Sequence, residues 1–112
     1  MDQWPDSWAG VAADKPFGVG LVTEFRRFLV YVQTLGLSPK TVRRHFDNLW
    51  VIGGEIIRRL NYQPALRQTK PRQLLLETIA DGTAPLARDA SEADQRGFDA
   101  TARKLLRFLA ET

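Results

Sequence analysis

The sequence predicts an all-α fold, and three observations support this prediction. Apolar residues recur at helical spacing over several long stretches, of which residues 21–35 are the first. The Ser38-Pro39 pair and the Ser-x-x-Asp pattern from Ser91 are typical of capped helix starts. No stretch alternates apolar and polar residues as a half-buried strand would. With 112 residues, 44% hydrophobic and 26% charged, we expect one compact soluble protein with a single core.

The first 20 residues, MDQWPDSWAGVAADKPFGVG, differ in character from the rest of the chain. They contain two prolines and three glycines and show no sustained period. We predict an irregular arm over residues 1–20, docked on a domain formed by residues 21–112. The large aromatic side chains of Trp4, Trp8 and Phe17 would cover apolar surface in this docking. Capture of a partner by the arm is the alternative.

Four helices are predicted after this arm. They cover residues 21–35, about 39–60, about 71–80 and about 92–111. Gly36 is a natural C-terminal cap of the first helix, and Ser38 is the N-cap of the second. The Gly53-Gly54 pair inside the second helix costs roughly 2 kcal/mol of helix propensity. This pair therefore indicates a close helix contact or a bend.

Charge and composition restrict the setting of the protein. The net charge is +3, and residues 21–62 carry seven basic against three acidic residues. This excess favours a polyanionic partner. The chain has no cysteine, no signal-peptide pattern and no apolar run long enough to cross a membrane. We expect a cytoplasmic protein without membrane association.

Motifs of enzymatic chemistry are not recognisable. His45 is the only histidine, and it lies at the border of the buried stripe of the second helix. We expect it to be partly buried and hydrogen-bonded rather than catalytic or metal-ligating. The sequence shows no Ser/His/Asp set, metal-binding pattern or glycine-rich phosphate loop. We therefore expect a protein that is not an enzyme and carries no cofactor or metal.

Basic residues gather on two of the predicted helices. On the second helix they project opposite the core: Lys40, Arg44 and Arg58, with Arg43 beside them. On the last helix, Arg96, Arg103 and Arg107 share one face, flanked by Lys104. Two helices that are apolar on one side and basic on the other would present a surface of the right sign to phosphates.

The alternative is that neighbouring carboxylates neutralise these residues and leave ordinary solvated helix surfaces. The pairs expected in that case are Asp47 with Arg43 or Arg44, Glu55 with Arg58 or Arg59, and Asp99 with Arg96 or Arg103.

Two stretches resemble known families. YVQTLGLSPKTVRRHF, residues 31–46, resembles the helix-turn-helix of response-regulator-type transcription factors. EFRRFLVYVQTLGLSPKTVRRHFDNLWVIGGEIIRRL (24–60), together with DATARKLLRFLAE (99–111), resembles the SAM-like N-terminal core-binding domain of phage-integrase-type tyrosine recombinases. The second resemblance spans about residues 21–112. It implies a compact four-helix SAM-like orthogonal bundle that grips one side of a DNA duplex while a separate catalytic domain closes the other.

The recombinase resemblance also implies which residues contact DNA. Carried onto matching positions, they are Lys40, Thr41, Arg43 and Arg44 on the second helix and Arg103 and Arg107 on the last. No nucleophilic-tyrosine region precedes Thr112, so we expect no recombination by this chain alone.

We therefore predict a non-catalytic DNA-binding module, accessory to or derived from a site-specific recombinase. Its partners would be the phosphate backbone of double-stranded DNA and a recombinase catalytic subunit or a second copy of the chain. One alternative is a helical protein-interaction module, homodimers included, with Trp4, Trp8 and Val51 or Val30 as exposed contacts. Another is a helix-turn-helix regulator that reads bases through the second helix.

Overall fold

The computed structural model describes residues 1–8 and 12–112, and all the regular structure in these ranges is helical. The elements are α1 (Trp4–Trp8), η1 (Ala12–Asp14), α2 (Lys15–Gln33), α3 (Pro39–Tyr62), η2 (Pro64–Gln68), α4 (Pro71–Thr78) and α5 (Glu92–Ala110), where η marks a 3-10 helix. The predicted all-α class is confirmed. The described part of the chain has five α-helices where four were predicted, and the additional one is α1.

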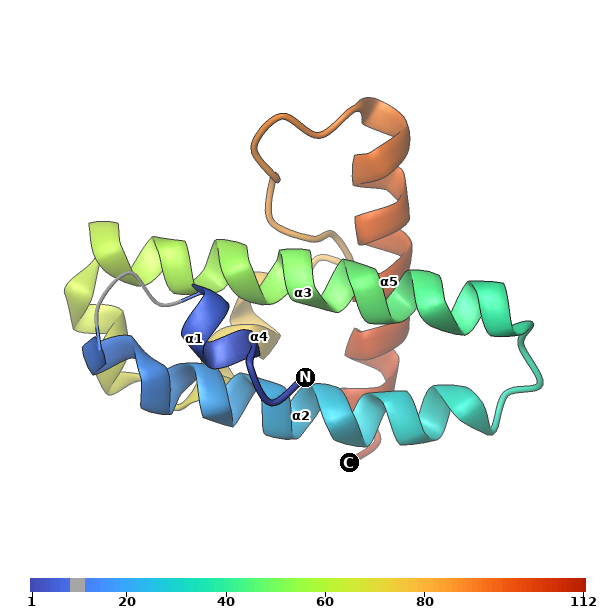
Figure 1. Ribbon diagram of the computed structural model, residues 1–112, viewed down its shortest axis with the longest axis horizontal. Helices are drawn as coiled ribbons and strands as arrows, with labels where there is room; N and C mark the ends of the chain where they lie inside the picture. The colour runs from blue at the N-terminus through green and yellow to red at the C-terminus, as the bar shows by residue number, and fades with distance from the viewer. Residues whose placement is uncertain (9–11) are drawn as a thin grey trace.

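Helices α2 and α3 form an antiparallel pair along the long axis of the molecule (Figure 1). The short α1 lies across the front of this pair, and α5 runs steeply across its back. Helix α4 packs against α2, and α5 contacts both α3 and α2. The fold therefore has two opposite faces, one covered by α1 and the other crossed by α5.

Local signals in the sequence set the starts of α3 and α5. Ser38 is the N-cap of α3, with φ −63° and ψ 152°, and its Oγ accepts a hydrogen bond from the Thr41 amide at 3.2 Å. Ser91 caps α5 in the same way, accepting from the Asp94 amide at 3.0 Å. Gly36 has φ 71° and turns the chain between α2 and α3. These predicted helix starts are confirmed.

The predicted irregular arm over residues 1–20 is wrong for most of its length. Residues Trp4–Trp8 form α1, and α2 begins at Lys15, six residues before the predicted start. Gly18 and Gly20, which suggested a broken helix, lie inside α2. A Cβ on Gly18 would lie 3.2 Å from Cβ of Pro5, and a Cβ on Gly20 would collide with the ring of Pro71. These glycines therefore allow neighbouring segments to approach α2 closely.

Other helix ends also differ from the prediction. Helix α2 ends at Gln33, so Leu35 lies outside it and is exposed although it was expected on the buried face. Helix α4 ends at Thr78 rather than Ala80. The core itself comes from all four longer α-helices and the segment after α4. Its largest fully buried side chains are Leu21, Phe25, Phe28, Leu49, Ile52, Ile56, Ile57, Leu60, Leu74, Leu75, Ile79 and Leu105.

Helix α1 packs against α3 at the Gly53-Gly54 pair. The indole ring of Trp8 lies over both glycines, and a Cβ on Gly53 would overlap that ring. Trp8 Nε1 also donates to the backbone oxygen of Trp50 at 2.9 Å. The ring of Trp4 packs 5.0 Å from that of Phe46. The predicted docking of the tryptophans is confirmed, and the glycine pair marks a close contact with α1.

Gly53→Ala is expected to displace Trp8 and loosen α1. Overpacking at such a contact costs about 1–3 kcal/mol, whereas Gly to Ala in a helix gains at most about 1 kcal/mol. We expect the free energy of unfolding to fall by roughly 1–2 kcal/mol, measured by urea denaturation. Tryptophan emission is a local probe here, because all three tryptophans of the chain, Trp4, Trp8 and Trp50, lie around this contact.

Gly97→Ala is the matched control, since Gly97 also lies inside a helix. The nearest atom to its added Cβ would be Asn48 Nδ2 at 3.9 Å, an ordinary contact. This variant should be as stable as the parent protein or slightly more stable. A Gly53→Ala protein with parental stability and unchanged emission would show that the Trp8 contact contributes nothing.

Candidate nucleic-acid interface

Buried polar contacts join α3 to α5 where the two helices cross. Asn48 Nδ2 donates to Thr101 Oγ1 at 2.9 Å and to the Gly97 carbonyl at 3.2 Å. The Nδ1 atom of His45 lies 2.8 Å from the same Thr101 Oγ1. His45 and Asn48 share one face of α3 because they are three residues apart, as Gly97 and Thr101 do on α5 at a spacing of four. These contacts fix how the two helices face each other.

A groove of about 420 Å³ opens between the two helices at this crossing. Four of its lining residues are cations, Arg44 from α3 and Arg103, Lys104 and Arg107 from α5. The remaining lining residues are Leu37, Thr41, His45, Asn48, Gly97 and Ala100. No carboxylate contributes to this lining, so the groove is strongly positive.

The four groove cations take part in none of the ion pairs formed among residues 1–8 and 12–112. Asp47, the expected partner of Arg43 or Arg44, pairs with Arg43 at 3.2 Å. Asp99 pairs with neither Arg96 nor Arg103, contrary to the expected alternative. Its Oδ1 accepts instead from the Ala84 amide at 2.9 Å and from Gln95 at 3.2 Å.

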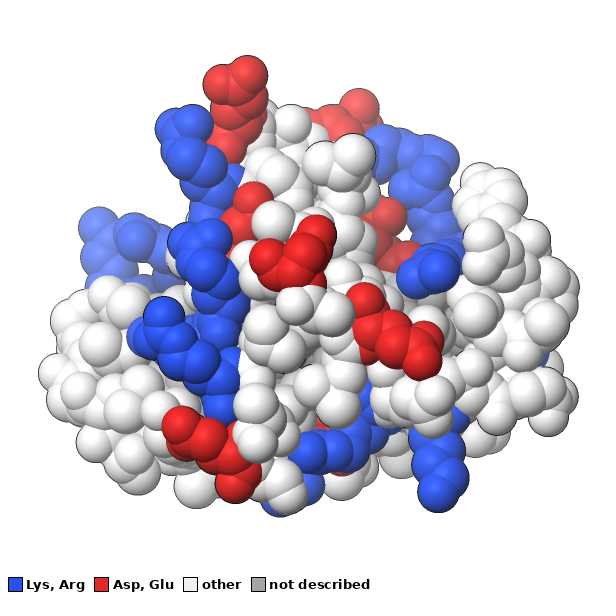
Figure 2. Space-filling view, turned by 180° about the vertical axis from the view of Figure 1, so that it is seen from behind, with Lys and Arg blue, Asp and Glu red and all other residues white. Residues whose placement is uncertain are grey.

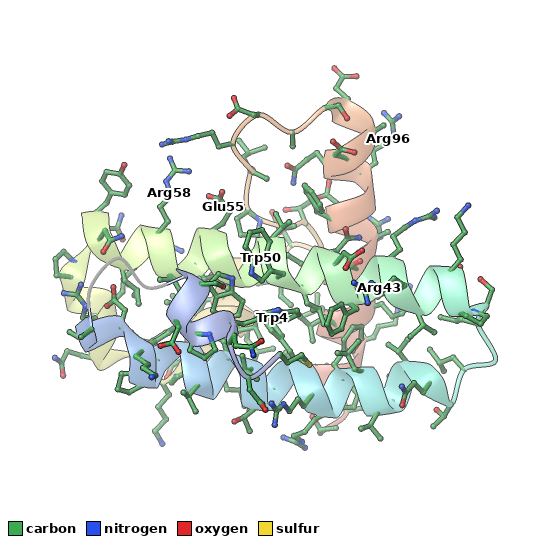
Figure 3. All side chains as sticks on the ribbon, in the orientation of Figure 1. Trp4, Arg43, Trp50, Glu55, Arg58 and Arg96 are labelled. Carbon is green, nitrogen blue, oxygen red and sulfur yellow. The ribbon has the colours of Figure 1, made fainter. Side chains whose placement is uncertain are left out.

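The remaining described carboxylate contacts leave the groove cations free in the same way. Glu55 pairs with Arg58 as expected, at 3.4 Å, and the two side chains lie at the far end of α3 from the groove (Figure 3). Asp14 is buried and pairs with Arg67, while Glu24 is shared by Arg27 and Arg72. Each of these carboxylates is therefore engaged with a residue other than the groove cations.

The face of the molecule that carries α5 shows the resulting charge pattern (Figure 2). Lys and Arg side chains form a column that follows α5 from one end toward the other. Arg96 stands near the start of this helix (Figure 3), and Arg103, Lys104 and Arg107 follow toward its end. The basic surface is therefore longer than the groove itself.

The structure brings four of the six predicted contact residues together in the groove: Thr41, Arg44, Arg103 and Arg107. Lys40 is exposed at the start of α3 and lies one turn from Arg44, outside the lining. Arg43 is not part of the groove. Successive residues of a helix are rotated by about 100°, which turns Arg43 away from its neighbour Arg44.

Arg43 lies on the face that carries α1. Its guanidinium stacks 4.9 Å from the centre of the Phe46 ring. Arg43 also lines a hollow with Trp4 and Trp50, and Figure 3 shows the three side chains on the front of the molecule.

Three polar or charged residues that line the groove were not among the predicted contacts: His45, Asn48 and Lys104. The fully buried Thr101, which lies within hydrogen-bond distance of the first two, was not predicted either. A pattern in the sequence could have identified the polar groove residues of α3. Thr41, His45 and Asn48 follow one another at spacings of four and three, so polar residues interrupt the apolar side of this helix. Such polar positions at a buried edge are typical of a helix crossing joined by hydrogen bonds.

The positive charge of the groove affects the pKa of His45. Its pKa is lowered from the usual 6.5, first by burial and then by the positive charges of Lys104 and Arg44. The side chain is 7% exposed, so it is more deeply buried than the partly buried histidine that was predicted, and the predicted hydrogen bond is present. A neutral imidazole at neutral pH follows from these surroundings.

Other predicted surfaces have a different character. Trp4 and Trp8 pack against the core, so they do not form the exposed apolar contacts expected for an interaction module. Val51 is half-buried, whereas Val30 is 65% exposed. In the described ranges, no group of three or more His, Cys, Asp or Glu side chains is arranged to hold a metal ion. Within these same ranges, no helix has the length and apolar character needed to cross a membrane.

Comparisons of the chain with protein-family models, curated proteins and solved structures gave no match. The resemblance to recombinase core-binding domains therefore stays a prediction.

The lowered pKa of His45 makes stability depend on pH. At pH values between the folded-state pKa of His45 and 6.5, the unfolded chain binds a proton more readily than the folded protein does. The contribution of neutral His45 to the free energy of unfolding is therefore complete above pH 6.5 and is lost as the pH falls. We expect urea denaturation to show a larger loss of stability from pH 7.5 to 5.5 in the parent protein than in His45→Gln. An equal loss in both proteins would contradict this assignment.

Proposed function

We propose that the groove between α3 and α5 binds the phosphate backbone of double-stranded DNA and that this chain is a non-catalytic DNA-binding module. One observation carries the proposal. Arg44 from α3 meets Arg103, Lys104 and Arg107 from α5 in a groove whose lining contains no carboxylate. Cations that lack a protein partner keep their full attraction for a polyanion.

The length of the basic surface favours duplex DNA over a small anion. Arg96 and Arg107 are eleven residues apart on α5, which corresponds to about 16 Å along the helix. Duplex DNA carries a charge every ~1.7 Å of its axis, so a cationic strip of this length meets several phosphates. A single small anion would fill the groove and leave the rest of the strip unused.

Phosphate contacts position a protein on DNA but carry little sequence information. We therefore propose a module that holds the duplex and leaves sequence selection and catalysis to another domain. Its proposed role beside a recombinase catalytic domain rests on the resemblance of residues 24–60 and 99–111 to core-binding domains.

The salt dependence of binding to a random-sequence duplex tests this proposal. Four groove cations predict a slope of log affinity against log salt of roughly −3 to −4. The triple variant Arg44→Gln, Arg103→Gln, Arg107→Gln should weaken binding at low salt at least about tenfold and bring the slope close to −1. Fluorescence anisotropy with a labelled duplex at several salt concentrations measures both quantities.

A second triple variant controls for the loss of three charges. Arg59, Lys70 and Arg88 are exposed, lie outside the groove and form no ion pair with a described residue. Their replacement by Gln removes the same net charge and should change the slope little. Equal losses in the two triple variants would mean that binding depends on net charge and not on the groove.

A further inference from the structure

One ring nitrogen of His45 has no hydrogen-bond partner in the described part of the protein. Nδ1 is engaged with Thr101, and Nε2 has no hydrogen-bond partner among the described residues. Among the described residues, Oδ2 of Asp14 is the only side-chain nitrogen or oxygen atom that is both buried and without a hydrogen-bond partner. Nε2 of His45 is therefore accessible, and because His45 lines the groove, this atom is available to a ligand there.

The hydrogen bonds around Thr101 favour one position for the proton of neutral His45. Thr101 Oγ1 already accepts from the amide of Asn48, and its own hydroxyl proton finds an acceptor in Nδ1 of His45. Neutral His45 is then protonated at Nε2, so an N–H donor faces the groove.

The same hydroxyl also suits the protonated state of His45. A threonine oxygen has two acceptor lone pairs, so it can accept from Asn48 and from a protonated Nδ1 at once. Protonation therefore keeps the hydrogen bond between Nδ1 and Thr101 Oγ1 with its direction reversed, and Nε2 gains a partner only when a ligand binds.

In the free protein, burial and then the nearby positive charges oppose protonation of His45. Lys104 from α5 and Arg44 from α3 are the charged groups that act on His45, and Arg103 and Arg107 line the same groove. Helix α2 contributes the ring of Phe28, whose centre is 6.4 Å from that of the imidazole. A bound anion would counter these cations and remove their opposition to an imidazolium.

We infer that His45 is a proton-linked ligand for phosphate in this groove, donating from Nε2 to a phosphate oxygen while Nδ1 takes up one proton from solvent. The inference rests on the proposed function in taking DNA as the source of the phosphate. The imidazolium adds a fifth positive charge at the floor of the groove, next to the bound anion. Affinity for DNA should therefore rise as the pH falls.

Nuclear magnetic resonance of the ring of His45 tests this inference directly, because the chain has no other histidine. The pKa of His45 is measured in the free protein and in the presence of saturating duplex, with binding followed separately by fluorescence anisotropy. We expect the pKa to rise on binding. A duplex that binds without moving this pKa would overturn the inference and leave the proposal of DNA binding intact.

Sulfate provides a second arm, since it is a tetrahedral dianion that does not titrate in this range. Sodium sulfate and sodium chloride are compared at equal ionic strength. If no duplex binds but sulfate raises the pKa of His45, the groove is an oxyanion site and the DNA proposal fails. If neither the duplex nor sulfate raises it, the inference is overturned.

The affinity for duplex should follow the same linkage. From pH 7.5 to 5.5 we expect the parent protein to bind roughly three- to tenfold more tightly, and His45→Gln to change less than about twofold. Circular dichroism is used to test whether the His45→Gln variant is folded. If the variant is unfolded, the magnetic resonance measurement of the His45 pKa in the parent protein tests the inference by itself. Equal pH dependence in the two folded proteins would contradict a role for His45.

Discussion

The crossing of α5 over α3 determines which charged residues of this protein meet. Asn48, Thr101 and the Gly97 carbonyl lock the crossing through hydrogen bonds that are largely removed from water. An unpaired polar group at such a place costs about 1–3 kcal/mol, so a sliding or rotated α5 is strongly disfavoured. Once the crossing is fixed, Arg44 and Arg103 must lie on the two walls of one groove. The proposed function depends on this constraint, since the crossing brings Arg44 of α3 beside the three groove cations of α5.

A cluster of unpaired cations is costly to keep, and one carboxylate on each of the two crossing helices is engaged elsewhere. Asp47 pairs with Arg43 on the opposite face, and Asp99 anchors the loop before α5 through the Ala84 amide. On the front of the molecule, α1 is held by apolar contacts and by the indole of Trp8 over Gly53. The two faces therefore differ: one is closed by aromatic packing, and the other presents a column of positive charge along α5 (Figure 2).

The sequence predicts those features that depend on local rules. The starts of α3 and α5 follow from Ser38 and Ser91, whose side chains cap the first turn. The early start of α2 was not predictable in this way, because Gly18 is a poor helix former whose role depends on its contact with Pro5. The direction of the Arg43 side chain was not predictable either, since helical rotation predicts only that two neighbouring arginine side chains point in different directions. Which one reaches α5 depends on the crossing, which arises from contacts between distant residues.

Arg43 and Arg44 therefore provide the most direct test of this account. They are adjacent, exposed arginines on one helix, and only Arg44 lines the groove. The affinity of each single alanine variant for a duplex is measured over a range of salt concentrations. We expect Arg44→Ala to weaken binding several-fold and reduce the steepness of the salt dependence by about one, whereas Arg43→Ala should leave that steepness unchanged. Equal effects of the two substitutions, or a larger effect of Arg43→Ala, would contradict a DNA site at the α3–α5 crossing.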